Sequence, residues 1–399
     1  MFFGLAVMAV AWLVLKEVFG KIKRIPIPEG LGFMLSGMLI GPLGLGLTGT
    51  ETVKFAPDIF RFLKVILLVH LGLRLSPDRI AKWDRSVMRL AVVAAFAQGL
   101  VVLLLGPRIL GLSSLDAALL AVSMSSVSSV LLIPDLAQLR IMGYGVHSDL
   151  SQRLTEASQG SEVLAVLLFS VLAQLREHGT GEILNLLYIP IALALGVLFA
   201  MAGSLLVQSS KRSPILDSLL CLSLAVILEY TTAFFSLPLS GSVAALVLGR
   251  TIRKRAPVKA EQIRELLDAV LDSVEGLSCI LLGACLTFPG GAGFEIGTAL
   301  ILVLPALLAR MGSTFLYAGF QRLPRGEQVF CTLAYVPAGA FQIALCGAAV
   351  SQGMDGKPLG AALAVYLALS SVLHRTLFAG VYRSLLVQES QYGKLTLVK

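Results

Sequence analysis

Charged side chains are scarce in this 399-residue chain: they make up 14% of it, whereas hydrophobic residues make up 56%. An ordinary soluble domain has about 25% charged and about 45–50% apolar residues. The charges also lie in clusters between long apolar runs, and a bilayer-spanning helix needs about 20 apolar residues. Such runs fill nearly the whole length, which excludes a sizeable water-soluble domain. The sequence therefore predicts a multi-pass, all-α membrane protein.

Several functional motifs are absent as well. No Walker A or other glycine-rich nucleotide motif is found, which excludes an ATP-driven pump. The five cysteines lie singly in apolar segments without CxxC or histidine spacing, a pattern typical of buried thiols rather than of disulfides or metal sites. The net charge of +8 is not gathered on a soluble domain, as nucleic-acid binding requires. With no nucleophile–base set either, we expect a protein that is not an enzyme, needs no cofactor and binds no nucleic acid.

The apolar runs predict thirteen spans when they are divided at glycine, proline and charge clusters. Their approximate ranges are 2–19, 29–47, 57–75, 87–106, 114–138, 152–174, 184–207, 214–232, 236–250, 262–288, 295–319, 328–351 and 358–384. The first range lacks a basic flank and a cleavage site, so we expect it to be retained.

Lys and Arg gather in alternate loops. The poorer side holds only Lys54, Arg61, Arg108, Arg176 and Lys357. By the positive-inside rule, we expect a plasma-membrane (bacterial inner-membrane) protein with its N-terminus outside and its C-terminus in the cytoplasm.

An odd number of spans suits two inverted six-helix units joined by a connecting helix. In transporters built this way, one broken helix from each unit meets the other at the midplane, and the ion site lies there. The fourth to sixth and eleventh to thirteenth spans are therefore where an ion site is expected.

Two of those spans contain residues that weaken a helix. In the fifth, five serines within seven residues precede Pro134; they are Ser123, Ser125, Ser126, Ser128 and Ser129. In the twelfth, Pro337 and Gly339 lie two positions apart. Ordinary helix packing also uses such residues. Their matching positions in both halves favour crossed, broken helices.

Two charges lie deep in apolar runs. Glu162 in the sixth span is a functional candidate, because a charge at membrane depth is costly; the alternative is a protonated Glu bonded to a neighbouring helix. Arg310 in the eleventh span stays charged, so it needs an anion or a helix C-terminus. We expect it to compensate half-helix ends and to pair with Glu162 when no ion is bound; snorkelling would have to cover about nine residues at 1.5 Å each. Glu156 is either an entrance group or an interfacial charge.

Other polar residues remain open. Glu229 lines an outer vestibule or lies in the interface, and His70 and His374 have no assigned role. Residues 260–275 are amphipathic and indicate an interfacial segment leading into the tenth span.

The chain resembles the monovalent cation:proton antiporters in a series of motifs that runs in order from about residue 28 to 385. The motifs are Pro28-Glu29-Gly30-Leu31-Gly32 through Gly46; Val69-His70-Leu71-Gly72-Leu73-Arg74, similar to that family's LLF-x-x-GLE segment; Leu239-Ser240-Gly241 through Gly249; and Arg322-Leu323-Pro324-Arg325-Gly326-Glu327 with Pro337-Ala338-Gly339-Ala340.

The resemblance implies the Na⁺/H⁺-antiporter fold, with a dimerisation panel and a mobile core that works by an elevator motion. By position, the panel would be 1–76 and 214–288, the core 86–175 and 295–384, the connecting helix 184–207, and the cytoplasmic tail 385–399. It also implies a homodimer in contact with membrane lipid.

The family's site residues fall on Ser161-Glu162 for its Asn-Asp or Asp-Asp pair, on Arg310 for its basic residue, and on Val127-Ser128 for its Thr-Asp. This chain departs from the pattern at three positions. Ser128 stands where the family has the Asp of Thr-Asp, Ser161 stands where it has Asn or Asp, and the site acid, Glu162, is Glu instead of Asp. These departures leave the identity of the cation open.

We expect an antiporter that exchanges H⁺ for Na⁺, K⁺ or Li⁺, with Glu162 binding the proton and the monovalent cation in turn. Ser161, Ser128, Ser125 and backbone carbonyls would complete an oxygen shell. A single titrating acid predicts electroneutral exchange. The alternative is a cation channel or a non-transporting sensor on the same scaffold.

Overall fold

The computed structural model describes residues 2–21, 28–42, 44–75, 85–146, 148–178, 183–209, 213–235, 240–286 and 292–388, and within them the chain is helical with no extended strand. The first half forms α1 (Phe2–Lys21), α2 (Glu29–Ile40), α3 (Gly49–Lys54), α4 (Ala56–Arg74), α6 (Arg85–Ile109), α7 (Ser114–Ser125), α8 (Ser129–Ile141) and α9 (Leu150–His178). The second forms α10 (Ile183–Ser209), α11 (Pro214–Phe235), α12 (Gly241–Arg255), α13 (Pro257–Cys285), α14 (Ala292–Phe320), α15 (Arg325–Ala334), α16 (Ala340–Ser351), α17 (Gly356–Thr376), a π-turn η1 (Leu377–Val381) and α18 (Tyr382–Leu385).

Eight helical segments of the described part are long and apolar enough to cross a membrane. Large apolar side chains point outward from several of them, including Leu13, Phe96, Leu198 and Leu308. The all-helical, multi-pass architecture expected from the sequence is thus confirmed. Each of the thirteen expected ranges overlaps at least one of the helices, while the count of thirteen crossings and the inverted repeat remain predictions.

One expected range is wrong: 29–47 is not one helix, because α2 ends at Ile40 and the short α3 begins only at Gly49. In the fifth expected span the break falls within the serine cluster, where α7 ends at Ser125 and α8 begins at Ser129, and Pro134 lies inside α8 without interrupting it. Residues 260–275 lie in the continuous 29-residue α13, so this amphipathic stretch leads directly into the tenth expected span.

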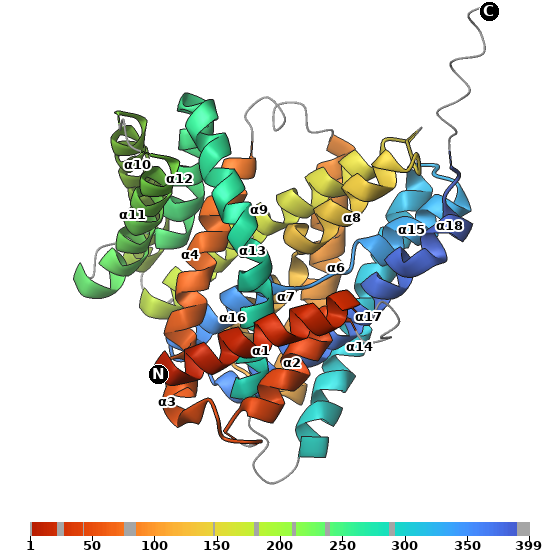
Figure 1. Ribbon diagram of the computed structural model, residues 1–399, viewed down its shortest axis with the longest axis horizontal. Helices are drawn as coiled ribbons and strands as arrows, with labels where there is room; N and C mark the ends of the chain where they lie inside the picture. Colours follow the sequence, from red (N-terminus) through yellow and green to blue (C-terminus); the bar gives the residue numbers. More distant parts are fainter. Residues whose placement is uncertain are drawn as a thin grey trace, which may run out of the picture.

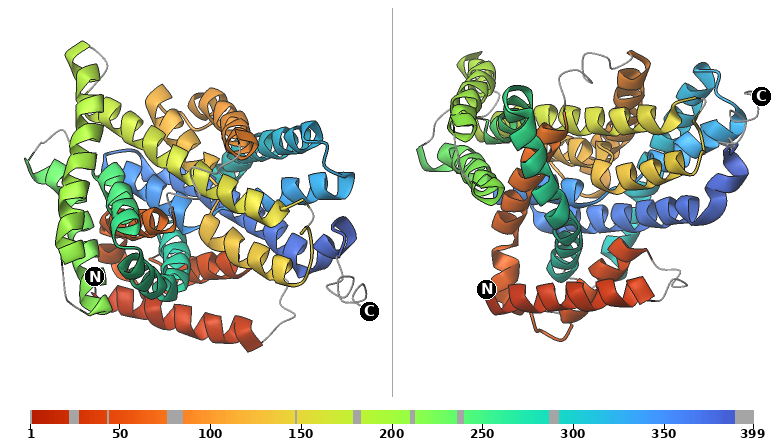
Figure 2. Two further views of the ribbon diagram at one scale, coloured as in Figure 1. Left: turned by 90° about the horizontal axis from the view of Figure 1, so that it is seen from above. Right: turned by 45° about the horizontal axis from the view of Figure 1, so that its top comes forward.

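The helices form two groups that lie side by side. In Figure 1, α4 and α10 to α12 lie on the left, and α6, α8, α15 and α18 lie on the right; both views in Figure 2 keep this division. Within the left group, α4 packs against α12 and α13 against α2. Within the right group, α14 packs against α6, and both α7 and α8 pack against α9.

The crossing of α4 with α12 shows why small residues recur in these helices. A Cβ atom added to Gly72 would lie 2.2 Å from the carbonyl oxygen of Leu246, and one added to Gly249 would lie 2.4 Å from that of Val69. The two backbones therefore touch at a pair of reciprocal glycines. Close backbone contact of this kind is how membrane helices gain packing energy where lipid offers no hydrophobic advantage.

Candidate functional site

Two interrupted helices meet in the right-hand group. α7 ends at Ser125 and α8 begins at Ser129, while α15 ends at Ala334 and α16 begins at Ala340. The backbone N–H of Ser128 donates to the carbonyl of Pro337 at 2.9 Å, which joins the two breaks directly. Gln342 of α16 adds a second link, because its Nε2 donates to the carbonyl of Ser126 at 3.0 Å and to the Ser126 hydroxyl at 3.1 Å.

Glu162 projects from α9 onto the first residue of α8. The backbone N–H of Ser129 donates to one carboxylate oxygen at 2.9 Å, and the Ser129 hydroxyl donates to the other at 2.6 Å. Glu162 is only 2% exposed. A helix N-terminus carries partial positive charge, so the end of α8 compensates a carboxylate at this place.

A second carboxylate occupies the equivalent place at the other break, and sequence reasoning missed it. Glu275 of α13 accepts the backbone N–H of Ala340, the first residue of α16, at 2.9 Å from each of its oxygens. A signal was present in the acidic residues of α13, which recur at intervals of four and three and so share one helix face. They are Glu261, Glu265, Asp268, Asp272 and Glu275.

Arg310 of α14 contacts the C-terminal ends of the half-helices α7 and α15. It is completely buried; its Nη1 donates to the carbonyl of Ser125 at the end of α7 at 3.0 Å, and its Nε donates to the carbonyl of Tyr335 after α15 at 2.8 Å. Nη1 also donates to Oε1 of Gln98 on α6. Helix C-termini carry partial negative charge, so one guanidinium compensates both half-helices.

The expected pairing of Arg310 with Glu162 does not occur in this structure: the ion pairs of the described residues include none between them. The physical reason is that each charge already has a helix end of opposite sign. Glu162 lies at an N-terminus, whereas Arg310 lies at two C-termini. Gln98 and Tyr335, which fix the guanidinium, were not singled out from the sequence, because an isolated amide or phenol in an apolar run is common.

The serines around the break divide into bonded and unbonded hydroxyls. Ser161 Oγ accepts the backbone N–H of Val127 at 3.1 Å and donates to the carbonyl of Ser158 at 2.7 Å. Ser125 Oγ donates to the carbonyl of Val122 in its own helix, so only its carbonyl enters the site. Ser128 is fully buried, and its hydroxyl has no hydrogen-bond partner among the described residues. That hydroxyl and the Glu162 carboxylate flank the start of α8.

A cavity of about 880 Å³ separates the two helix groups and reaches the second break. Pro337 and Ala338 line its inner end, and Asp268, Asp272 and Glu275 line one wall. Among the described residues, Glu162 and Glu156 are not part of its lining. Glu156, the expected entrance group, instead accepts a hydrogen bond from Gln152 in its own helix at 2.9 Å.

The two histidines left open by the sequence are hydrogen-bonded to carboxylates. His70 Nε2 lies 2.7 Å from Asp268 Oδ1, and His374 Nε2 lies 2.8 Å from Asp135 Oδ2. Each contact joins two helices: α4 to α13, and α17 to α8.

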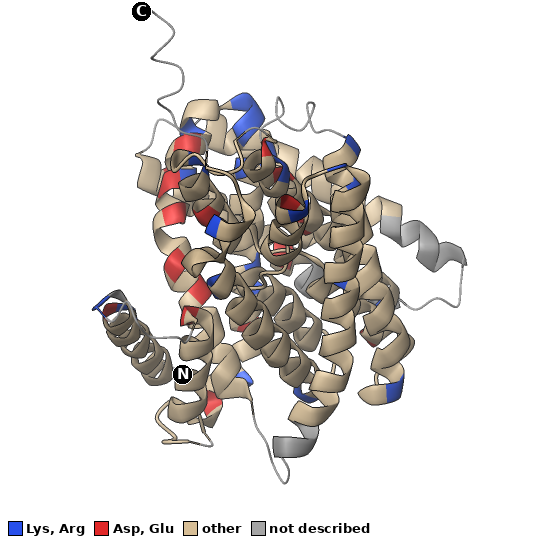
Figure 3. Ribbon diagram, turned by 90° about the vertical axis from the view of Figure 1, so that its right-hand side faces the viewer, with Lys and Arg blue, Asp and Glu red and all other residues tan. Residues whose placement is uncertain are grey.

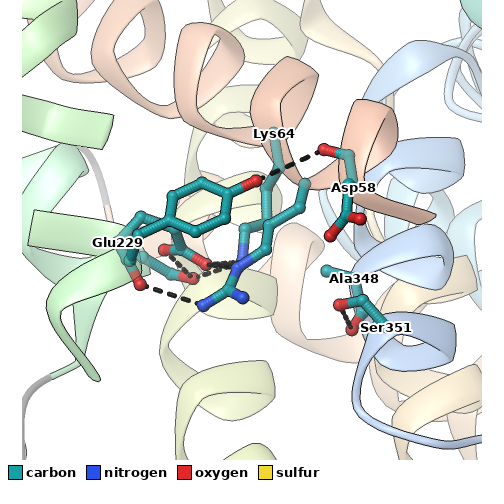
Figure 4. Close-up of polar contacts among 8 residues, drawn as sticks. Asp58, Lys64, Glu229, Ala348 and Ser351 are labelled. Carbon is teal, nitrogen blue, oxygen red and sulfur yellow. Dashed lines mark hydrogen bonds and ion pairs between the residues drawn. The ribbon is translucent and has the colours of Figure 1, made fainter. Parts of the chain in front are cut away.

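Glu229 belongs to a buried charge cluster that it forms with Arg61 and Lys64 of α4 (Figure 4). Lys64 donates to its carboxylate at 2.7 Å, and Arg61 does so at 3.1 Å. The cluster borders a second cavity, of about 650 Å³, which supports the vestibule alternative for Glu229 over the interfacial one. Sequence reasoning missed Lys64, although it is 3% exposed and follows Phe62-Leu63 within an apolar run, where an ionisable residue marks a functional candidate.

The fold and the site together define a class of protein. A multi-pass helical protein whose two broken helices meet, with charges at the half-helix ends, has the architecture of secondary ion transporters. The chain belongs to the transmembrane sodium/hydrogen exchanger family, whose profile matches residues 6–381. This match confirms the resemblance found in the sequence.

Individual relatives are distant. The chain is similar to sodium/hydrogen exchanger 9B2 of Mus musculus, with 23% identity over 355 residues that cover 86% of this chain and 64% of that protein. Sodium/hydrogen exchanger 9B1 of Homo sapiens is 23% identical over 327 residues, covering 80% and 63% respectively. The chain thus spans less than two thirds of the length of these relatives.

A solved structure shares the fold. The sodium proton antiporter MjNhaP1 from Methanocaldococcus jannaschii, determined at pH 8, superposes with a TM-score of 0.72 at 17% identity, covering 96% of this chain and 98% of that one. At that level of identity the likeness shows a common fold.

Proposed function

We propose that the chain exchanges protons for a monovalent cation, Na⁺, K⁺ or Li⁺, across the plasma membrane, and that Glu162 is the group both ions bind. The observation that carries the proposal is the Glu162 carboxylate, buried at the start of α8 and bonded there by both Ser129 groups. A carboxylate with serine hydroxyls and backbone oxygens nearby suits a hard cation. The family membership supports the same reaction.

Competition at one carboxylate supplies the coupling. A bare Glu162 anion is costly to carry through an apolar barrier, whereas a protonated or cation-bound Glu162 is neutral. Ser128 Oγ, which has no partner among the described residues, and Ser161 Oγ are candidates for an oxygen shell. The Ser125 carbonyl already accepts a hydrogen bond from Arg310. Because Arg310 never loses its proton, it fixes the half-helix ends and carries no proton itself.

The movement would follow the division into two helix groups. In this proposal, the core (86–175 and 295–384) carries both breaks and slides against the panel (1–76 and 214–288), whose residues also form the homodimer contact. The connecting helix 184–207 and the tail 385–399 complete the chain. Reciprocal glycine packing between α4 and α12, both panel elements, supports a rigid panel.

The test is exchange in liposomes, with intravesicular pH followed after addition of Na⁺, K⁺ or Li⁺. Glu162→Gln keeps the shape of the side chain and removes the charge, so we expect it to abolish cation-driven proton movement. Glu156→Gln is the matched control on the same helix, because Glu156 bonds only within α9 in the described structure and its loss should leave exchange intact. Near-normal exchange by Glu162→Gln would remove this residue from the mechanism. No pH response to any cation in the unmodified protein would favour a channel or sensor.

A further inference from the structure

The contact between Glu275 and α16 joins the panel to the core. Glu275 lies on α13, in the panel range, while Ala340 opens α16, in the core range. Glu162 and Ser129 both belong to the core, so their contact travels with it. The contact of Glu275 with the N–H of Ala340 has to break whenever the core moves, and any inference about it rests on the function proposed above.

The fit at this contact is close. A Cβ atom on Gly339 would lie 2.2 Å from Glu275 Oε1, so the carboxylate fills the space that a side chain at position 339 would take. Glu275 has no Lys or Arg partner among the ion pairs of the described residues, although it is partly buried. Its compensation is the positive end of α16. The Glu275 carboxylate therefore links α13 to the half-helix α16 in addition to the packing between these helices.

Glu275 lines the larger cavity. The acidic residues of α13 share one helix face that ends at Glu275. Figure 3 shows red acidic segments one below another along one side of the molecule. Two acids above it already have cationic partners: Asp268 contacts His70 and Arg264, and Asp272 contacts Lys16. The titratable and charged groups that share the cavity wall with Glu275 are Glu29, Arg74, Asp135, Asp268, Asp272, Cys279, His374 and Arg375.

We propose that Glu275 is a second ion-responsive carboxylate that couples the cavity to the movement of the core. As an anion it holds the N-terminus of α16 against α13 and keeps the cavity open. When Glu275 takes up a proton or a monovalent cation from the cavity, its charge is neutralised, the hold on Ala340 weakens, and the core is free to move. Glu275 is thus a positioning residue that acts through α16, distinct from the carrier carboxylate Glu162.

Two substitutions remove the contact from opposite sides. Glu275→Gln removes the charge and keeps the shape. Ala340→Pro removes the donor N–H at the first position of a helix, where proline is tolerated. Should the proline variant not fold, Gly339→Ala displaces the carboxylate instead. Asp272→Asn is the matched control, because Asp272 lies on the same face of α13, one turn before Glu275, and pairs with Lys16 instead of α16.

The measurement is the labelling rate of Ser371→Cys, at a cavity-lining position, by a membrane-impermeant maleimide in the full-length protein. The parent chain with its native cysteines gives the background. We expect Glu275→Gln and Ala340→Pro each to lower the open-to-closed ratio about tenfold, equivalent to about 1.4 kcal/mol. The double variant should match the single ones, because both remove one contact. Asp272→Asn should label like the parent.

Acid and cation should reproduce the effect. To leave Glu162 out of the response, both samples carry Glu162→Gln, and each rate is corrected for the fall in thiolate fraction with pH. Lowering the pH or adding Na⁺ should then slow labelling of Glu162→Gln and have little effect on Glu162→Gln/Glu275→Gln. Unchanged labelling in both contact variants, or an equal change in Asp272→Asn, would overturn the proposal. Labelling does not require transport, so the two proposals fail separately. A labelling response without exchange would retain the role of Glu275 and reject the antiporter. Exchange without a labelling response would retain the antiporter and reject the role of Glu275.

Discussion

Replacing Arg310 by alanine should destabilise the protein without involving Glu162. The change removes Nε and Nη1 and with them three hydrogen bonds to buried acceptors, the carbonyls of Ser125 and Tyr335 and the amide oxygen of Gln98. Interhelical hydrogen bonds in membrane proteins average about 0.6 kcal/mol, which gives about 2 kcal/mol for three as a lower bound. A buried acceptor left without a partner costs about 1–3 kcal/mol, which raises the expected loss above that bound. We expect a loss of about 2–5 kcal/mol.

Double-mutant cycles then identify the partner. Unfolding free energies in mixed micelles would be measured for Arg310→Ala combined with Glu162→Gln and, separately, with Gln98→Ala. Because Arg310 and Glu162 do not touch, their losses should add within about 0.5 kcal/mol. Arg310 and Gln98 are in contact, so their cycle should show an interaction energy of about 0.5–3 kcal/mol. An interaction above about 1 kcal/mol between Arg310 and Glu162, with none to Gln98, would refute the compensation of Arg310 by helix ends.

Three further outcomes follow from other charges. The rate of Na⁺ or Li⁺ exchange in liposomes should not depend on a membrane potential set by a K⁺ gradient and valinomycin, because Glu162 binds either one proton or one cation. Acceleration of exchange by the potential would show a second transported charge. Lys64→Met should lower the thermal midpoint of unfolding, because it leaves the buried Glu229 with Arg61 alone. The double variant Lys64→Met/Glu229→Gln should regain part of that loss, and no recovery would mean that the two residues are not coupled. At the start of α13, Arg264 and Arg253 lower the pKa of Glu261 to about 2, so its stabilising effect is present above its ordinary pKa and is lost as the pH falls from about 4.5 toward 2. Glu261→Gln should therefore lower the thermal midpoint at neutral pH and lose its effect near pH 2; a larger effect in acid would contradict this sign.

Much of the architecture could be predicted because membrane helices are set by apolar length. The serine cluster and the Pro337–Gly339 pair marked both breaks, since they deprive a helix of side-chain packing and backbone donors. Pro134 is the sixth residue of α8 and removes one intrahelical hydrogen bond, yet the helix continues through it, so the proline does not set the break. The cut between α7 and α8 is set instead by backbone groups that find partners on the other broken helix, such as Ser128 N with Pro337 O. Contacts across that distance in the sequence leave no local signal.

Side-chain pairing was harder to predict than position. Glu162 and Arg310 were recognised as deep charges, but the sequence does not give the rotation of α9 and α14 about their axes, and this rotation decides what each side chain meets. Opposite charges suggested a pair, whereas the helix ends supplied partners of their own. Glu275 and Lys64 were missed for a different reason. Each shares its helix with other charged residues, so neither was the lone charge of its helix.

The four half-helix ends explain why these charges are where they are. Breaking two helices at membrane depth exposes two positive N-termini and two negative C-termini, and each needs a charge of opposite sign. Arg310 meets both C-termini, while Glu162 and Glu275 each meet one N-terminus. The set therefore holds one fixed positive charge and two carboxylates at helix N-termini. Under the two proposals made above, Glu162 moves with the core and Glu275 stays with the panel. An ion bound at Glu162 then changes the charge that moves, and an ion bound at Glu275 weakens the contact that holds the core in place.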